Sequence, residues 1–125
     1  MAVCEAFDAV RAAIDAGTAA VEPGTAGHEA DAMARETLTD RGYEWYAHTP
    51  GHQVGRHAHG GGTLLGPRWE RYGAAPERPM RVSEVQTVEL DVDTEHGYVG
   101  GEEMVAVTES GTGWVREPQR ESWRP

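Results

Sequence analysis

The chain has 125 residues, which corresponds to one domain or to part of a larger one. Its net charge of −10 makes nucleic acid and anionic membranes poor partners. It lacks both an apolar run near the ~18 residues of a membrane span and a signal-peptide pattern at its N-terminus, so we expect a cytoplasmic protein. The single cysteine, Cys4, excludes an internal disulfide and a thiolate zinc site.

The basic residues share one feature: all eleven are arginine. A GC-rich genome produces such a bias. A salt-loving organism is the second interpretation, because carboxylate-rich surfaces stay hydrated in salt, and the acidic composition is compatible with it. Both interpretations remain open.

Two amphipathic helices are expected first in the chain, over about residues 3–17 and 26–41. Gly17 would end the first helix, and Thr25 and Gly42 would cap the second. Each segment carries one apolar stripe at helical spacing. The first stripe consists of Val3, Phe7, Val10 and Ile14, and the second of Ala30, Met33, Ala34 and Leu38.

A sheet is expected after the helices, over about residues 48–110. Glycine becomes dense there, and valine and threonine replace alanine. The stretch "SEVQTVELDV" alternates between two faces, and "EEMVAVT" predicts a second short strand. We therefore predict an α+β fold with a mainly antiparallel sheet, in a domain spanning residues 1–115 with a tail at 116–125.

The segment "DTEHGY" between these two strands predicts a tight turn with Glu95 and His96 at its tip. Such a turn places Glu89 directly opposite Glu102. Two facing carboxylates repel each other unless both point to water or a cation lies between them. A divalent metal is one such cation. A longer turn with a shifted register and two solvated glutamates is the alternative.

A glycine-rich stretch, "HTPGHQVGRHAHGGG", holds four of the six histidines, His48, His52, His57 and His59. Neutral imidazole is a good ligand for zinc, cobalt or manganese, and glycines let a backbone approach a ligand closely. The same stretch is also compatible with an ordinary polar loop. The run "HGGG" lacks the nucleophile elbow that would accompany an oxyanion hole.

Taken together, these segments resemble the pita-bread metallopeptidases, the family of methionine aminopeptidases, Xaa-Pro aminopeptidases and prolidases. The family's "GHGxG" is similar to "GHQVG", which makes His52 the metal-binding histidine. A catalytic histidine follows seven residues later in the family, and His59 matches it. His48 in "HTPGH" matches the first histidine of "HGTGH", whereas His57 has no counterpart.

The two glutamates also match family motifs. "SEVQTVEL" resembles "GMVFTIEP" and assigns Glu89 as a ligand, and "GEEMVAVTESG" resembles "IEDMVLVTEDG" and assigns Glu102 as the bridging ligand. The helical lead resembles the family as well, so the likeness runs from about residue 5 to 112. It implies half of a pita-bread fold, the C-terminal half of the catalytic domain.

The resemblance implies a metal-dependent Xaa-Pro-type aminopeptidase or dipeptidase, which hydrolyses a peptide with a metal-activated water. The complete family site holds two divalent ions, manganese, cobalt, zinc or iron, and its remaining ligands are two aspartates upstream of the first helix. This chain has no matching pair, so we expect it to hold at most one ion. Leu90 replaces the proline after the first glutamate, and Asp91 on the Glu89 face is a further candidate ligand.

A non-catalytic role is the alternative function. In it, the chain is an assembly half that pairs with itself or with a separate N-terminal half. A lone half of a two-lobed domain leaves an open strand edge and an uncovered apolar face.

Overall fold

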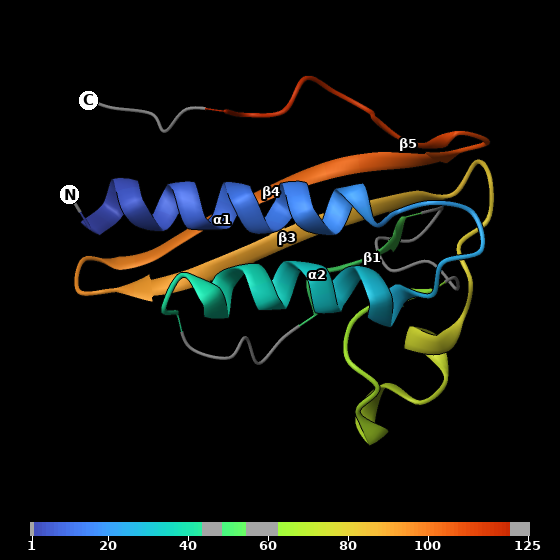
Figure 1. Cartoon of the computed structure of the whole chain (residues 1–125), viewed down its shortest axis with the longest axis horizontal. Helices are drawn as coiled ribbons and strands as arrows, with labels where there is room; N and C mark the ends of the chain where they lie inside the picture. Colours follow the sequence, from blue (N-terminus) through green and yellow to red (C-terminus); the bar gives the residue numbers. More distant parts are fainter. Residues whose placement is uncertain (1, 44–48, 55–62, 121–125) are drawn as a thin grey trace.

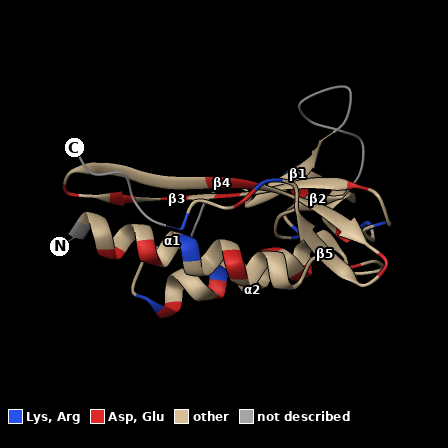
Figure 2. Ribbon diagram, turned by 90° about the horizontal axis from the view of Figure 1, so that it is seen from above, with Lys and Arg blue, Asp and Glu red and all other residues tan. Residues whose placement is uncertain are grey.

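The structure, a computed structural model, describes residues 2–43, 49–54 and 63–120. Helices α1 (Ala2–Ala19) and α2 (Gly27–Asp40) lie side by side on one face of an antiparallel sheet (Figures 1 and 2). The prediction of two helices followed by a mainly antiparallel sheet is therefore confirmed.

The described sheet has the strand order β2-β1-β3-β4-β5. A connector with two short 3-10 helices, η1 (Glu70–Tyr72) and η2 (Ala75–Glu77), leads from β2 to β3. The long hairpin of β3 and β4 forms the centre of the sheet and passes beneath α1 (Figure 1). The strands are β1 (Gly51–Val54), β2 (Leu64–Leu65), β3 (Val85–Thr94), β4 (Gly97–Thr108) and β5 (Gly111–Trp114).

The hydrophobic core lies between the helices and the sheet, where Val10 and Ile14 of α1 are fully buried together with Val88 of β3. Gly17 does not end α1, contrary to expectation, because the helix continues to Ala19. A Cβ at Gly17 would lie 3.2 Å from Cβ of Ala34, so this glycine allows α1 and α2 to approach closely.

The ends of α2 follow the sequence in part. Ala26, and not Thr25, is the N-cap residue, and the Glu29 carboxylate accepts a hydrogen bond from the Ala26 N–H at 2.8 Å. Glu29 therefore satisfies one of the N–H groups at the start of the helix. Gly42 follows the C-cap with φ of 89°, a left-handed conformation that glycine adopts without strain.

A buried ion pair attaches the β2–β3 connector to α2. Arg35 is 2% exposed, and its Nη2 donates to Asp31 one turn earlier at 2.7 Å. Trp69 of the connector stacks on the Arg35 guanidinium at 5.4 Å from ring centroid to Cζ. The aromatic ring thus covers a charge that has left water, and the connector is fixed over the helix.

A second polar cluster attaches α1 to the other end of the sheet. Arg11 donates to Glu103 of β4 at 2.8 Å, with both side chains largely buried. The guanidinium carbons of Arg11 and Arg120 lie over the ring of Trp114 on β5, at 6.0 and 5.4 Å from its centroid. Arg120 also forms an ion pair with Asp15 at 2.8 Å. The described part of the predicted tail, up to residue 120, is therefore held against α1.

Candidate metal centre

The β3–β4 hairpin has the register that the sequence predicts. Thr94 pairs with Gly97 across a two-residue turn, and Glu89 pairs directly with Glu102. The Thr94 hydroxyl donates to the Gly97 carbonyl at 2.8 Å, and Gly97 adopts φ of 107°. The shifted register, which would separate the two carboxylates, is excluded.

The two faces of this hairpin have opposite character. Toward the helices, Val88 and Leu90 are buried, and Glu103 binds Arg11. Side chains on a strand alternate, so Glu89 and its partner Glu102 project from the other face, which the helices leave open (Figure 2).

The electrostatics of the pair favour a bound cation. Burial, followed by the nearby negative charge of Glu102, raises the pKa of the Glu89 carboxyl, whereas His52 and a hydrogen bond from Thr87 act in the opposite direction. Glu89 is half-buried and Glu102 is exposed. Two close carboxylates destabilise each other when both are ionised, and a divalent ion removes that repulsion.

His52 lies on β1 beside the same face of β3. Its backbone N–H donates to the Thr87 hydroxyl at 3.1 Å, and its side chain is close enough to Glu89 to influence that pKa. Its Nδ1 lies 3.1 Å from the Gln53 carbonyl. This contact favours the tautomer with the proton on Nδ1, which leaves Nε2 as the electron-pair donor.

Thr87 is a site residue that the residue pattern alone did not identify. It is 3% exposed, and its hydroxyl joins β1 to β3 next to the glutamate pair. The quoted motif "GMVFTIEP" carries a threonine two residues before its glutamate, which is the signal that would have found it. The proposed substrate-side residues His48 and His59 lie outside the described ranges.

An open pocket of about 350 Å³ surrounds the carboxylate pair. Asp91 lines it and is exposed, on the same face of β3 as Glu89. Gly100 pairs with Asp91, and a Cβ there would lie 3.0 Å from Cβ of Asp91, so the glycine keeps this side of the pocket open.

The donor set fits a divalent cation in part. Carboxylate oxygens are ligands that manganese and similar ions accept. Among the residues that the structure describes, no group of three or more His, Cys, Asp or Glu is placed to hold a metal ion. The described pair, Glu89 and Glu102, thus supplies part of a coordination sphere.

Comparisons with solved structures show extensive similarity. The dipeptidase PepE from Mycobacterium ulcerans is 26% identical with a TM-score of 0.82, and the match covers 96% of this chain and 31% of that one. The prolidase from Pyrococcus horikoshii is 25% identical with a TM-score of 0.81, covering 94% of this chain and 32% of that one. The X-Pro aminopeptidase from Thermotoga maritima is 25% identical with a TM-score of 0.79, at 94% and 32% coverage.

The chain spans about a third of the length of these three structures. The methionine aminopeptidase from Rickettsia prowazekii, at 16% identity and a TM-score of 0.67, shares the fold. The architecture is therefore half of a pita-bread fold, as predicted.

A comparison with curated proteins gave no match. Within the described ranges, the helices are too short or too polar to cross a membrane. The profile of metallopeptidase family M24 matches residues 2–109, and the chain belongs to this family.

Proposed function

We propose that this chain contributes His52, Glu89 and Glu102 to the metal centre of an Xaa-Pro-type aminopeptidase or dipeptidase. The observation that carries the proposal is the direct pairing of Glu89 with Glu102, which brings two carboxylates together on the open face of the sheet. The names of the similar structures, dipeptidase, prolidase and X-Pro aminopeptidase, support the substrate class.

Each proposed residue has a distinct task. Glu89 and Glu102 would hold the cation through their carboxylate oxygens, and His52 would bind it through Nε2, since its Nδ1 lies against the Gln53 carbonyl. A divalent ion held there, manganese, cobalt, zinc or iron, would supply Lewis-acid chemistry that activates a water for attack on the peptide carbonyl. By family resemblance, His48 and His59 would act on the substrate and assist proton transfer.

The proposal includes a partner for the open face. Residues 1–115 then form the C-terminal half of the catalytic domain, and an N-terminal half supplies the family's two aspartates. With His52, Glu89 and Glu102 alone, we expect at most one bound ion, because a two-ion site needs the further ligands. Peptide hydrolysis therefore requires the completed domain.

The ligand assignment is tested by calorimetric titration with manganese at about pH 7.5, where histidine is neutral. Glu102→Ala should weaken binding at least about tenfold, which corresponds to ~1.4 kcal/mol. The matched control is Glu95→Ala, which removes a carboxylate from the turn of the same hairpin, where the side chain is 76% exposed. Circular dichroism verifies that both variants fold. Equal loss in the two variants, or no binding by the unmutated chain, contradicts the assignment.

The activity is tested by hydrolysis of an Xaa-Pro dipeptide, with the chain alone and mixed with a separately produced N-terminal half that carries the aspartate pair. We expect turnover only in the mixture, and its loss in Glu102→Ala. The non-catalytic alternative predicts a different result: the two halves associate, yet the mixture hydrolyses nothing at any manganese or cobalt concentration.

A further inference from the structure

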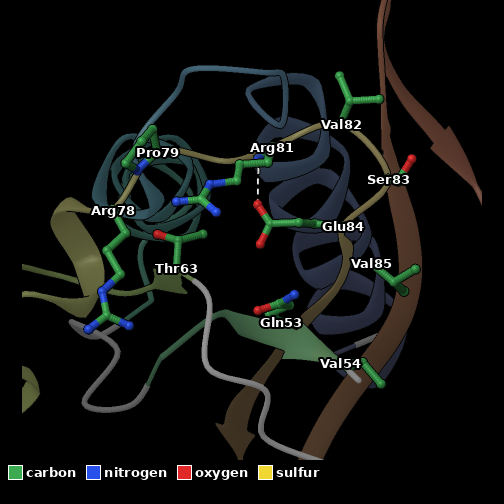
Figure 3. A pocket seen from close by; sticks show the side chains of 10 residues that line it. All are labelled: Gln53, Val54, Thr63, Arg78, Pro79, Arg81, Val82, Ser83, Glu84 and Val85. Atoms are coloured by element: carbon green, nitrogen blue, oxygen red, sulfur yellow. Dashed lines mark hydrogen bonds between the residues drawn. The ribbon is translucent and has the colours of Figure 1, made fainter. Parts of the chain in front are cut away.

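The pairing of β1 with β3 stops just before the proposed metal ligand of β1. Gln53 lies opposite Gln86, and this is the last ladder pair in the direction of the site. Figure 3 shows the regular end of the ladder, where Gln53 and Val54 lie beside the start of β3 and border a pocket of about 640 Å³. The same register would set His52 opposite Thr87. These two residues, both within the described ranges, form no ladder pair.

A side chain takes the place of the backbone acceptor at this point. The His52 N–H donates to the Thr87 hydroxyl at 3.1 Å, whereas regular antiparallel pairing would use a backbone carbonyl of the opposite strand. The Thr87 carbonyl instead lies against Gly51, where an added Cβ would overlap it. Beyond this point the Glu89 N–H donates to the Pro50 carbonyl at 2.6 Å, which joins the two segments again. The backbone position of His52 therefore depends on one hydroxyl group.

The same hydroxyl also reaches the other proposed ligand. A hydroxyl offers one proton and two lone pairs. Because a backbone N–H can only donate, the Thr87 oxygen is the acceptor toward His52, and its proton is free for the Glu89 carboxylate, which accepts a hydrogen bond from Thr87. Alternation along β3 places Thr87 and Glu89 on the same face. One side chain thus links two proposed ligands that come from different strands.

The surroundings of Thr87 make this link rigid. Its side chain has two substituents on Cβ, which restrict its rotamer, and the residue is only 3% exposed. A buried N–H without an acceptor costs free energy, so removal of the hydroxyl would drive the His52 backbone toward another acceptor. A metal site tolerates displacements of its ligands of only about 0.5 Å. A shift of His52 would therefore reach the metal centre.

We propose that Thr87 is a positioning residue, whose hydroxyl holds His52 within reach of the cation that Glu89 and Glu102 would bind. Hydrogen-bond partners behind a metal ligand typically change metal affinity by about 10–100-fold. The effect on a metal ion rests on the proposed function, whereas the hydrogen bond to the His52 backbone does not.

The test compares Thr87→Val, which keeps the shape and removes the hydroxyl, with Thr87→Ser, which keeps the hydroxyl. Calorimetric titration with manganese at about pH 7.5 measures the affinity. We expect Thr87→Val to weaken binding at least about tenfold and Thr87→Ser less than about threefold. Thr18→Val is the matched control, because it removes a buried hydroxyl of α1 that has no hydrogen-bond partner among the described residues. It should leave the affinity unchanged.

A double-mutant cycle with His52→Ala separates positioning from a general loss of stability. If the hydroxyl acts through His52, Thr87→Val costs less affinity in the His52→Ala chain than in the unmutated chain, because the ligand that it positions is gone. Equal cost in both chains overturns the proposal, as does a Thr87→Ser chain that binds as weakly as Thr87→Val, or equal weakening by Thr18→Val. If Thr87→Val does not fold, Thr87→Ala and Thr87→Ser make the same comparison, since they differ by one hydroxyl.

Amide hydrogen exchange of the metal-free chain separates failure of this proposal from failure of the metal centre. We expect the His52 amide to lose protection in Thr87→Val and to keep it in Thr87→Ser. If the unmutated chain binds no manganese, the proposed metal centre is rejected, and the exchange result alone decides the role of Thr87. Faster exchange only in Thr87→Val then supports Thr87 as the residue that fixes His52. Equal exchange in the three chains overturns the proposal.

Discussion

The ionised carboxylate of Glu89 opposes folding of the metal-free chain, although the hairpin register fixes its position. Burial and Glu102 raise the pKa of its carboxyl, so the folded chain without metal binds a proton at Glu89 more tightly than the unfolded chain does. The stabilising effect of that proton is complete below the unfolded pKa, about 4.3, and is lost as the pH rises through the raised folded value.

Glu89→Gln is therefore predicted to stabilise the metal-free chain at neutral pH, with the gain shrinking toward pH 4. Urea denaturation in a chelator at several pH values measures the difference. Glu95→Gln, which makes the same change at the exposed turn of the hairpin, is the matched control. An equal effect of Glu89→Gln at all pH values would mean that ionisation of Glu89 does not oppose folding.

Ser83 carries local strain that a glycine would remove. Its φ of 75° lies in the left-handed region, which costs residues with a Cβ roughly 1–2 kcal/mol. The family motif "GMVFTIEP" has glycine at this position. Part of the gain is offset because glycine makes the unfolded chain more flexible.

We predict that Ser83→Gly raises the free energy of unfolding by about 1 kcal/mol, measured by urea denaturation. Ser110→Gly is the matched control, because Ser110 is another exposed serine in a turn and has no positive φ. Ser110→Gly should be neutral or slightly destabilising. Equal stabilisation by both changes would point to a general effect of glycine in turns and not to relief of strain.

Among the structural elements, the long ones were predictable and the short ones were not. The β3–β4 hairpin combines regular alternation with a two-residue turn, and these features fix its register. Strands β1, β2 and β5 are two to four residues long, too short for alternation to show. His52 was therefore recognised from a motif, whereas its position beside Glu89 depends on pairing between segments far apart in the sequence.

The buried arginines mark another limit of the sequence. Hydrophobic periodicity treats arginine as a polar, exposed residue, yet Arg11 and Arg35 are almost fully buried. The partner of Arg11, Glu103, is 92 positions away, so only the assembled fold brings the two charges together. Gln86 is a polar residue whose burial the strand alternation does predict, because it falls on the same face as Val88 and Leu90. It is fully buried there, and its side chain has no hydrogen-bond partner within the described ranges.

The Arg11–Glu103 pair is predicted to stabilise the packing of α1 on the sheet. Glu103→Gln should lower the free energy of unfolding by about 1–3 kcal/mol, because it leaves a largely buried guanidinium without its close anionic partner on β4. Asp15→Asn removes the exposed anionic partner of Arg11 and should cost less than ~1 kcal/mol. Denaturation of the two variants side by side measures the contrast, and a larger loss for Asp15→Asn would refute it.

In the molecule as a whole, both helices cover one face of the sheet and leave the other open (Figure 2). β5 pairs with β4 only from Val105 to Thr108, so the outer edge of Gly97–Glu103 has no strand partner among the described residues. An unpaired strand edge favours association with another chain.

We therefore predict that the chain self-associates, or that it is only marginally stable as a monomer. Sedimentation velocity over a range of concentrations should show an average mass that grows with concentration. Addition of a complementary N-terminal half should replace that species with a defined heterodimer. A compact monomer that melts cooperatively at high temperature would contradict this prediction.

The opposite orientations of Glu102 and Glu103 constrain how this hairpin can change in evolution. Suppose that one residue is inserted or deleted in β4 between Gly97 and Gly101 while the pairs next to the turn are kept. Every later residue of β4 would then turn its side chain to the opposite face of the sheet. Glu103 would then point to the pocket, and Glu102 would point toward Arg11. A single length change would thus disturb the proposed ligand set and the helix anchor together. Length variation among descendants of this sequence should accordingly be confined to the turn at Glu95 and His96. The ten residue pairs along β3 and β4 hold the register whatever the length of that turn.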